Sequence, residues 1–139
     1  MRTEKLVESK PKGNLLQNTL RGNAAFSVIS GILFIFAARP LTEFVGLPYP
    51  WVFIVVGATL FPFAYIVYQI AMRSPINQKG AVAIIEMDIA WVVGSFILLF
   101  VLWSTLTVAG KWFVFLQAEA IATFALFQFI GLRRLQKNQ

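Results

Sequence analysis

Hydrophobic positions fall into four long runs along the chain, and short polar segments separate them. The runs cover residues 23–38, 51–72, 81–103 and 112–132. A membrane-spanning α-helix needs about 20 predominantly apolar residues, so each run predicts one transmembrane helix. The first connecting segment, "RPLTEFVGLPYP", contains three prolines and predicts a structured turn rather than a fifth helix. The pattern therefore predicts an all-α membrane protein with four transmembrane helices in an up-down bundle.

Polar segments at both ends divide the chain further. Residues 1–19 are predicted to form a cytoplasmic tail, residues 20–133 the transmembrane domain, and residues 134–139 a second cytoplasmic tail. The first apolar run is predicted to be a retained span and not a cleaved signal peptide. It follows a long polar leader, and a proline directly follows the small residues of "FAARP", which makes a poor cleavage site.

Lysine and arginine residues determine the predicted orientation, because cytoplasmic segments of membrane proteins are enriched in them. The chain has twelve lysine and arginine residues, and two of them, Arg39 and Lys111, lie in the first and third connections. The other ten predict that both termini and the middle connection face the cytoplasm of a bacterial inner membrane. The net charge of +6 follows from this asymmetry, and basic residues beside spans favour anionic lipid headgroups over nucleic acid. The ten are Arg2, Lys5, Lys10, Lys12, Arg21, Arg73, Lys79, Arg133, Arg134 and Lys137.

Composition agrees with the membrane assignment and limits the available chemistry. Hydrophobic residues make up 58% of the chain and charged residues 13%, which is outside the usual range of soluble proteins. The chain contains no cysteine, which excludes disulfides and thiolate metal sites, and no histidine, the commonest transition-metal ligand. The sequence also contains no nucleophile motif and no glycine-rich phosphate loop. We therefore expect a non-enzymatic protein with no metal and no cofactor.

The two halves of the sequence resemble each other. The segment "NAAFSVISG" from Asn23 aligns with "DIAWVVGSF" from Asp88, and Trp51 aligns with Trp112 without a gap in the second helices. This pattern favours two pseudo-repeated helical hairpins, related by an axis along the membrane normal. Convergence of two apolar hairpins is the alternative.

Four polar residues lie at similar depth near the cytoplasmic side of the first and third spans. In the repeat alignment Arg21 lies over Glu86, and Asn23 lies over Asp88. If these two helices approach each other, a carboxylate can accept hydrogen bonds from Arg21 or Asn23 and form a structural polar clasp. Residues two apart on a helix point about 200° apart, so only one acid can serve this contact. A proton or ion site is the functional alternative.

Glu119 lies inside the fourth predicted span. It follows Trp112 by seven residues, which places it about 10 Å into the membrane. Ionisable residues at this depth are typical of proton and ion pathways, so Glu119, Gln117 and Tyr65 form a candidate ion or proton site. The structural alternative is a protonated acid that donates one hydrogen bond across a helix pair.

The segments "NAAFSVISG" and "MDIAWVVGS" resemble the first and third helices of a group of small, uncharacterised bacterial four-span membrane proteins. The resemblance covers nearly the whole chain after Leu15. It implies the four-helix architecture and a role for Asn23, Asp88, Trp91 and Ser95. It implies no activity.

Together these features predict a non-enzymatic integral membrane protein that serves as an accessory or scaffolding subunit, or as a homo-oligomer. Its expected partners are the lipid bilayer and other membrane-protein subunits or further copies of itself. The alternative is a small proton- or cation-coupled transporter that uses Glu119.

Overall fold

The computed structural model describes residues 14–138, and this part of the chain forms five α-helices and no β-strand. All of them except α3 are long and apolar enough to cross a membrane. The predicted fold class, an all-α membrane protein with four long helices, is confirmed. The helices are α2 (Asn14–Phe36), α3 (Ala38–Val45), α4 (Pro50–Met72), α5 (Gln78–Val101) and α6 (Val108–Lys137).

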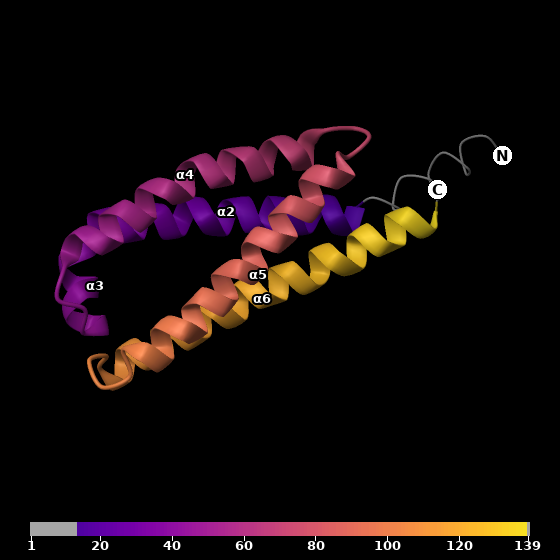
Figure 1. Cartoon of the computed structure of the whole chain (residues 1–139). Helices are drawn as coiled ribbons and strands as arrows, with labels where there is room; N and C mark the ends of the chain where they lie inside the picture. Colours follow the sequence, from indigo (N-terminus) through magenta and orange to yellow (C-terminus); the bar gives the residue numbers. More distant parts are fainter. Residues whose placement is uncertain (1–13, 139) are drawn as a thin grey trace.

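The four long helices form two antiparallel hairpins, α2 with α4 and α5 with α6 (Figure 1). Helix α2 also packs against α6, and this contact joins the hairpins. Helices α4 and α5 meet beside their connecting loop and then diverge (Figure 1). We call the end that holds this loop, the start of α2 and the C-terminal part of α6 the terminal end. The opposite end, which holds α3 and the α5–α6 turn, is the α3 end.

Local sequence explains where the helices of the second hairpin begin. Asn77 Oδ1 accepts a hydrogen bond from the Gly80 N–H at 3.2 Å, and Thr107 Oγ1 accepts one from the Gly110 N–H at 2.8 Å. Such caps satisfy N–H groups that have no partner within the first turn of a helix. Each apolar run of this hairpin therefore starts at a defined residue.

The connection between the first two spans contains the short helix α3, so the expectation of a turn without a helix is wrong. Pro40 lies in the first turn of α3, where its missing N–H breaks no intrahelical hydrogen bond. Gly46 ends the helix with a φ of 90°, the left-handed conformation that glycine adopts without strain. One face of α3 packs on α4 and α6. The buried residues on it are Ala38, Thr42 and Val45.

The first helix begins earlier than the apolar run predicts. Helix α2 starts at Asn14, inside the segment 1–19 that was assigned to a polar tail. Leu16 and Leu20 are fully buried, and Gly131 of α6 lies against the backbone of Leu16. Packing on α6 therefore stabilises a turn that hydropathy alone assigns to the tail. The basic residues Arg2, Lys5, Lys10 and Lys12 lie outside the described part of the chain.

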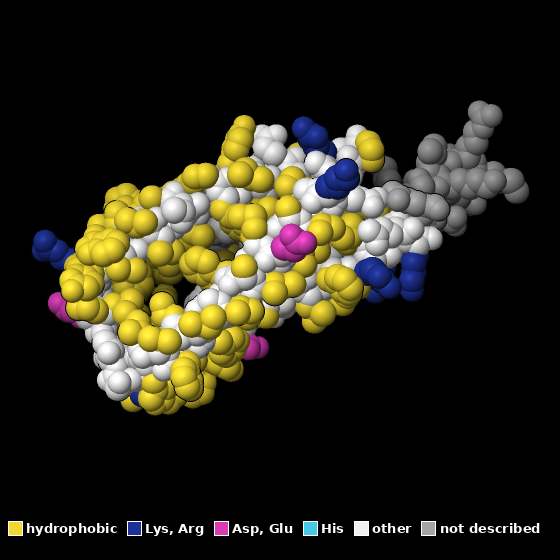
Figure 2. Space-filling model, viewed as in Figure 1, with side chains coloured by type: hydrophobic (Ala, Val, Ile, Leu, Met, Phe, Trp, Pro, Cys, Tyr) yellow, Lys and Arg dark blue, Asp and Glu magenta, His cyan; other side chains and the backbone are white. Residues whose placement is uncertain are grey.

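Two buried clusters hold the hairpins together, one at each end. The terminal-end cluster joins all four long helices and includes Leu16, Val67 and Ile84. The α3-end cluster includes Val45, Phe53 and Val114. Apolar side chains also cover most of the surface that faces the viewer (Figure 2), as expected for helices in contact with lipid.

Candidate functional site

Three helices meet at a buried polar group inside the bundle. Asn23 Nδ2 of α2 donates a hydrogen bond to Asp88 Oδ2 of α5 at 2.8 Å, and Gln128 Nε2 of α6 donates one to the same oxygen at 3.0 Å. The exposed fractions of Asn23, Asp88 and Gln128 are 0%, 3% and 0%. We call these three residues the Asp88 cluster. It links both hairpins through one carboxyl oxygen.

The Asp88 cluster has more hydrogen-bond acceptor positions than donors bonded to them. Asn23 Oδ1 and Gln128 Oε1 are buried and have no hydrogen-bond partner within residues 14–138. A carboxylate offers about four acceptor positions, and the two amide groups occupy positions on only one of its oxygens. Buried acceptors of this kind usually have a partner, so the cluster can accept a further donor.

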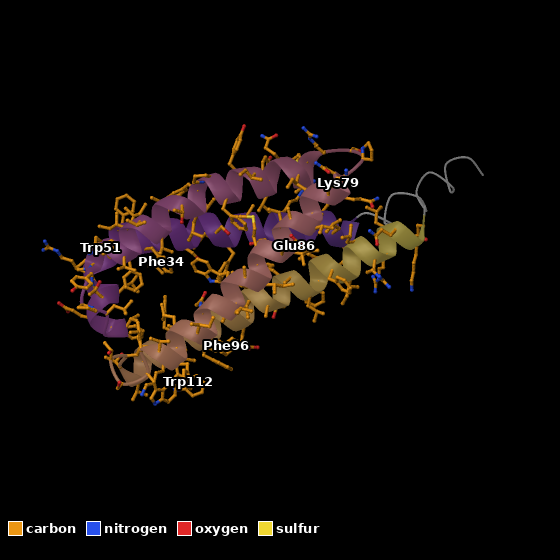
Figure 3. The ribbon with its side chains drawn as sticks, in the orientation of Figure 1. Phe34, Trp51, Lys79, Glu86, Phe96 and Trp112 are labelled. Carbon is orange, nitrogen blue, oxygen red and sulfur yellow. The ribbon has the colours of Figure 1, made fainter. Side chains whose placement is uncertain are left out.

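The structure brings together two of the four residues predicted for the clasp. Asn23 and Asp88 form the contact, whereas the guanidinium of Arg21 lies on the exposed side of α2 with Nη2 at 3.7 Å from Met72 Sδ. Glu86 is exposed on the outer face of α5 (Figure 3). The reason is the helical spacing: residues two apart point to nearly opposite sides. Arg21 and Glu86 therefore do not contribute to the contact between α2 and α5.

A second polar group links α5 to α6 nearer the α3 end. Trp91 Nε1 donates to Gln117 Oε1 at 2.7 Å, and Gln117 Nε2 donates to Ser95 Oγ and to the Val114 carbonyl, both at 2.9 Å. Ser95 Oγ donates in turn to the Trp91 carbonyl at 2.8 Å. We call Trp91, Ser95 and Gln117 the Gln117 cluster. Its amide and indole groups all have partners within the cluster or on the adjacent backbone.

The candidate ion site of Glu119, Gln117 and Tyr65 is not assembled in the structure. Gln117 points into the bundle, but Glu119 is exposed on another side of α6. Tyr65 is 65% exposed on α4, and the backbones of α4 and α6 do not approach each other closely in the described structure. Gln117 and Glu119 are two positions apart on one helix and so face different directions. Within residues 14–138 no group of three acidic side chains could hold a metal ion.

A hollow lies between the hairpins, between the two buried clusters. It consists of two neighbouring lobes with volumes of about 590 and 440 Å³. Figure 2 shows the hollow on the face where α4 and α5 diverge. The larger lobe reaches Val45 and Leu47 at the α3 end, and the smaller lobe reaches Asp88. Both lobes are lined by Phe34, Met87, Trp91, Phe113 and Gln117.

Sequence reasoning did not identify Gln128 as a partner of Asp88, and it did not anticipate the hollow. A usable signal for Gln128 exists, because an amide within an apolar span needs a hydrogen-bond partner inside the protein. The hollow has no local sequence signal, since it depends on how far α4 and α5 diverge.

No family model, curated protein or solved structure matches the chain. The function is therefore inferred from the residues and their arrangement.

Proposed function

We propose that the protein is a non-enzymatic integral membrane protein that acts by assembling with other transmembrane chains, as an accessory or scaffolding subunit or as a homo-oligomer. The observation that carries this proposal is the exposed position of Glu119 on α6. The residue lies about 10 Å along the helix from Trp112, inside the apolar region. A charged group at the centre of a span costs about 3 kcal/mol on insertion scales. A neighbouring helix that binds the carboxyl group would remove much of this cost.

The exposed side of α6 has the residue spacing of a helix–helix seam. Exposed residues recur alternately four and three positions apart, as in helices that pack along a common stripe. Glu119 lies in the middle of this stripe. Thr123 Oγ1 donates to the Glu119 carbonyl at 2.9 Å, so the acceptor lone pairs of this hydroxyl remain available to a partner. We call Trp112, Leu116, Glu119, Thr123 and Leu126 the Glu119 stripe; all five are exposed.

The polar groups inside the bundle also support a structural role. Both the Asp88 cluster and the Gln117 cluster connect different helices of the same chain. The transport alternative has less support, because Glu119 lines neither lobe of the hollow and Tyr65 is exposed on α4, whose backbone does not approach α6 closely.

The proposed orientation places the terminal end in the cytoplasm of a bacterial inner membrane. Lys79 lies at this end, and Trp51 and Trp112 lie at the α3 end (Figure 3), as expected for an interfacial aromatic belt opposite the basic side. We expect an impermeant thiol reagent to label Glu43→Cys in intact cells and Asn138→Cys only after permeabilisation. Both positions are exposed, and the chain has no native cysteine to interfere. The opposite labelling pattern would contradict this orientation.

The Glu119 stripe can be tested by cysteine crosslinking in native membranes. Leu116 belongs to the stripe and is 58% exposed, whereas Val93 of α5 is 52% exposed and lies at a matching distance from the outer end of its helix. We expect Leu116→Cys to form a crosslinked product with a second copy or with another membrane protein, and Val93→Cys to form none. Mass spectrometry of the product distinguishes a homo-oligomer from an accessory subunit.

Variants of Glu119 complete the experiment. In the Leu116→Cys background, Glu119→Ala should abolish the crosslink, and Glu119→Gln should retain it because the amide still forms hydrogen bonds. Equal crosslinking from Leu116→Cys and Val93→Cys would contradict the assembly proposal. Proton-driven uptake by the parent protein in vesicles, lost in Glu119→Gln, would favour the transporter instead.

A further inference from the structure

We propose that the hollow between the hairpins binds an amphipathic lipid that consists of one apolar chain ending in a hydroxyl group, a long-chain or isoprenoid alcohol. The chain would occupy the larger lobe, and the hydroxyl group would reach the Asp88 cluster through the smaller one. This site is separate from the Glu119 stripe and does not depend on the assembly proposal.

The larger lobe selects an apolar chain because its walls offer almost no free polar group. Phe34, Phe53, Leu98 and Phe113 supply apolar surface from all four long helices. The polar residues in this wall belong to the Gln117 cluster, and their amide and indole groups already bind one another. A polar ligand in this lobe would lose its hydrogen bonds to water and gain none in return.

Closure at both ends of the hollow favours a single chain over a transmembrane helix. The buried clusters close the space toward both ends of the bundle, whereas a helix of about 20 residues that crosses the membrane would extend past them. A ligand can therefore enter sideways between α4 and α5, on the face where these helices diverge (Figure 2). Lipid chains can enter from the bilayer by this route.

The smaller lobe selects a hydrogen-bond donor. Its wall contains Asp88 and the hydroxyl-bearing residues Ser27, Ser30 and Thr59. Asn23 and Gln128, whose side-chain oxygens have no partner within the described residues, belong to the same cluster behind Asp88 and line neither lobe themselves. An anionic head such as a carboxylate or phosphate would be repelled by the Asp88 carboxylate in this weakly screened interior. A hydroxyl group donates the bond that this acceptor-rich site lacks.

Gly94 allows the hollow to be filled without disturbing the helices. It lines the larger lobe, and a Cβ added there meets no atom of the described chain within 4 Å. Gly94→Leu therefore places a side chain in the space assigned to the lipid chain. Ala83→Leu is the matched control, because Ala83 is an exposed residue of the same helix and lines neither lobe.

The test uses the purified protein in liposomes with a photoreactive, diazirine-bearing hexadecanol, followed by mass mapping of the labelled residues. We expect labelling of wall residues such as Met87 and Phe113 in the parent protein and in Ala83→Leu. In Gly94→Leu the labelling should fall by about tenfold, because the leucine takes up the space of the chain, while the melting temperature stays unchanged or rises. Equal labelling of parent and Gly94→Leu would overturn the proposal.

Competition identifies the head group and the kind of chain. Unlabelled hexadecanol should displace the probe. Ionised palmitate and hexadecyl methyl ether should displace it poorly, because neither has a hydrogen-bond donor for Asp88. Displacement by the ether as effective as that by hexadecanol would overturn the assignment of the hydroxyl. A stronger effect of geranylgeraniol than of hexadecanol would identify the chain as isoprenoid, and the reverse order would identify it as a straight chain.

Discussion

Replacing Asp88 with alanine is expected to lower the free energy of unfolding by about 3 kcal/mol. The change removes the shared acceptor of the Asn23 and Gln128 side chains, both of which are fully buried. Each buried donor left without a partner costs about 1–3 kcal/mol. The matched control is Glu86→Ala, which removes an exposed acid two positions away on the same helix and should change stability by less than about 0.5 kcal/mol. Reversible unfolding in mixed detergent micelles measures both values.

A triple variant distinguishes the cost of leaving the Asn23 and Gln128 amides without a partner from the effect of removing the Asp88 carboxyl group itself. Changing Asn23, Asp88 and Gln128 together to leucine removes all donors and acceptors of the Asp88 cluster, so none is left unsatisfied. Removal of all partners is often close to neutral, and we expect the triple variant to be more stable than Asp88→Ala. If Asp88→Ala and Glu86→Ala lose the same stability, the Asp88 cluster does not hold the hairpins together.

Replacing Gly110 with alanine is expected to cost about 2–3 kcal/mol and to detach α3 from α6. The new Cβ would lie 2.1 Å from the Val45 carbonyl oxygen and 2.8 Å from the Val45 carbonyl carbon. The backbone there is held in place, because the Thr107 N–H donates to the same Val45 oxygen at 3.0 Å and Thr107 Oγ1 donates to the Phe44 carbonyl. The clash therefore cannot be relieved by rotation of a side chain.

The control for Gly110 is another glycine inside a helix. The Cβ added by Gly94→Ala meets no atom of the described chain within 4 Å. This change should stabilise α5 by up to about 1 kcal/mol, because alanine has the higher helix propensity. Thermal unfolding measures both variants, and limited proteolysis of the segment around Leu47 measures the release of α3. Similar losses in Gly94→Ala and Gly110→Ala would show that close backbone contact at Gly110 is not the cause.

The positions of the four long helices could be predicted because apolar runs of sufficient length have few other stable conformations in a membrane. The expectation of a turn without a helix after the first span was wrong, and helix α2 starts earlier than the apolar run, in both cases where tertiary contacts outweigh local composition. Pro40 suggested a turn, but in the first turn of α3 it is compatible with a helix. The start of α2 was assigned to a polar tail, although Leu16 packs against Gly131 on a distant helix.

The candidate sites were predicted less completely than the helices. The repeat alignment placed Asn23 opposite Asp88, and their side chains are hydrogen-bonded in the structure. It could not show that Gln128 shares the same oxygen, because the counterpart of Gln128 in that alignment is the apolar Val67. Gln117, Glu119 and Tyr65 were grouped by polarity and depth alone, and the rotation of each helix separates them.

The sequence by itself determined the membrane class and the number of long apolar helices. It also excluded the chemistry that cysteine and histidine side chains supply. These properties depend on composition and run length, which need no knowledge of neighbouring helices. Only the tertiary structure decided that Asp88 faces inward while Glu86 and Glu119 face outward, and that α4 and α5 diverge around a hollow. The physical reason is that helix rotation and crossing depend on contacts between residues far apart in the chain, such as Gly31 with Gly57 and Leu16 with Gly131.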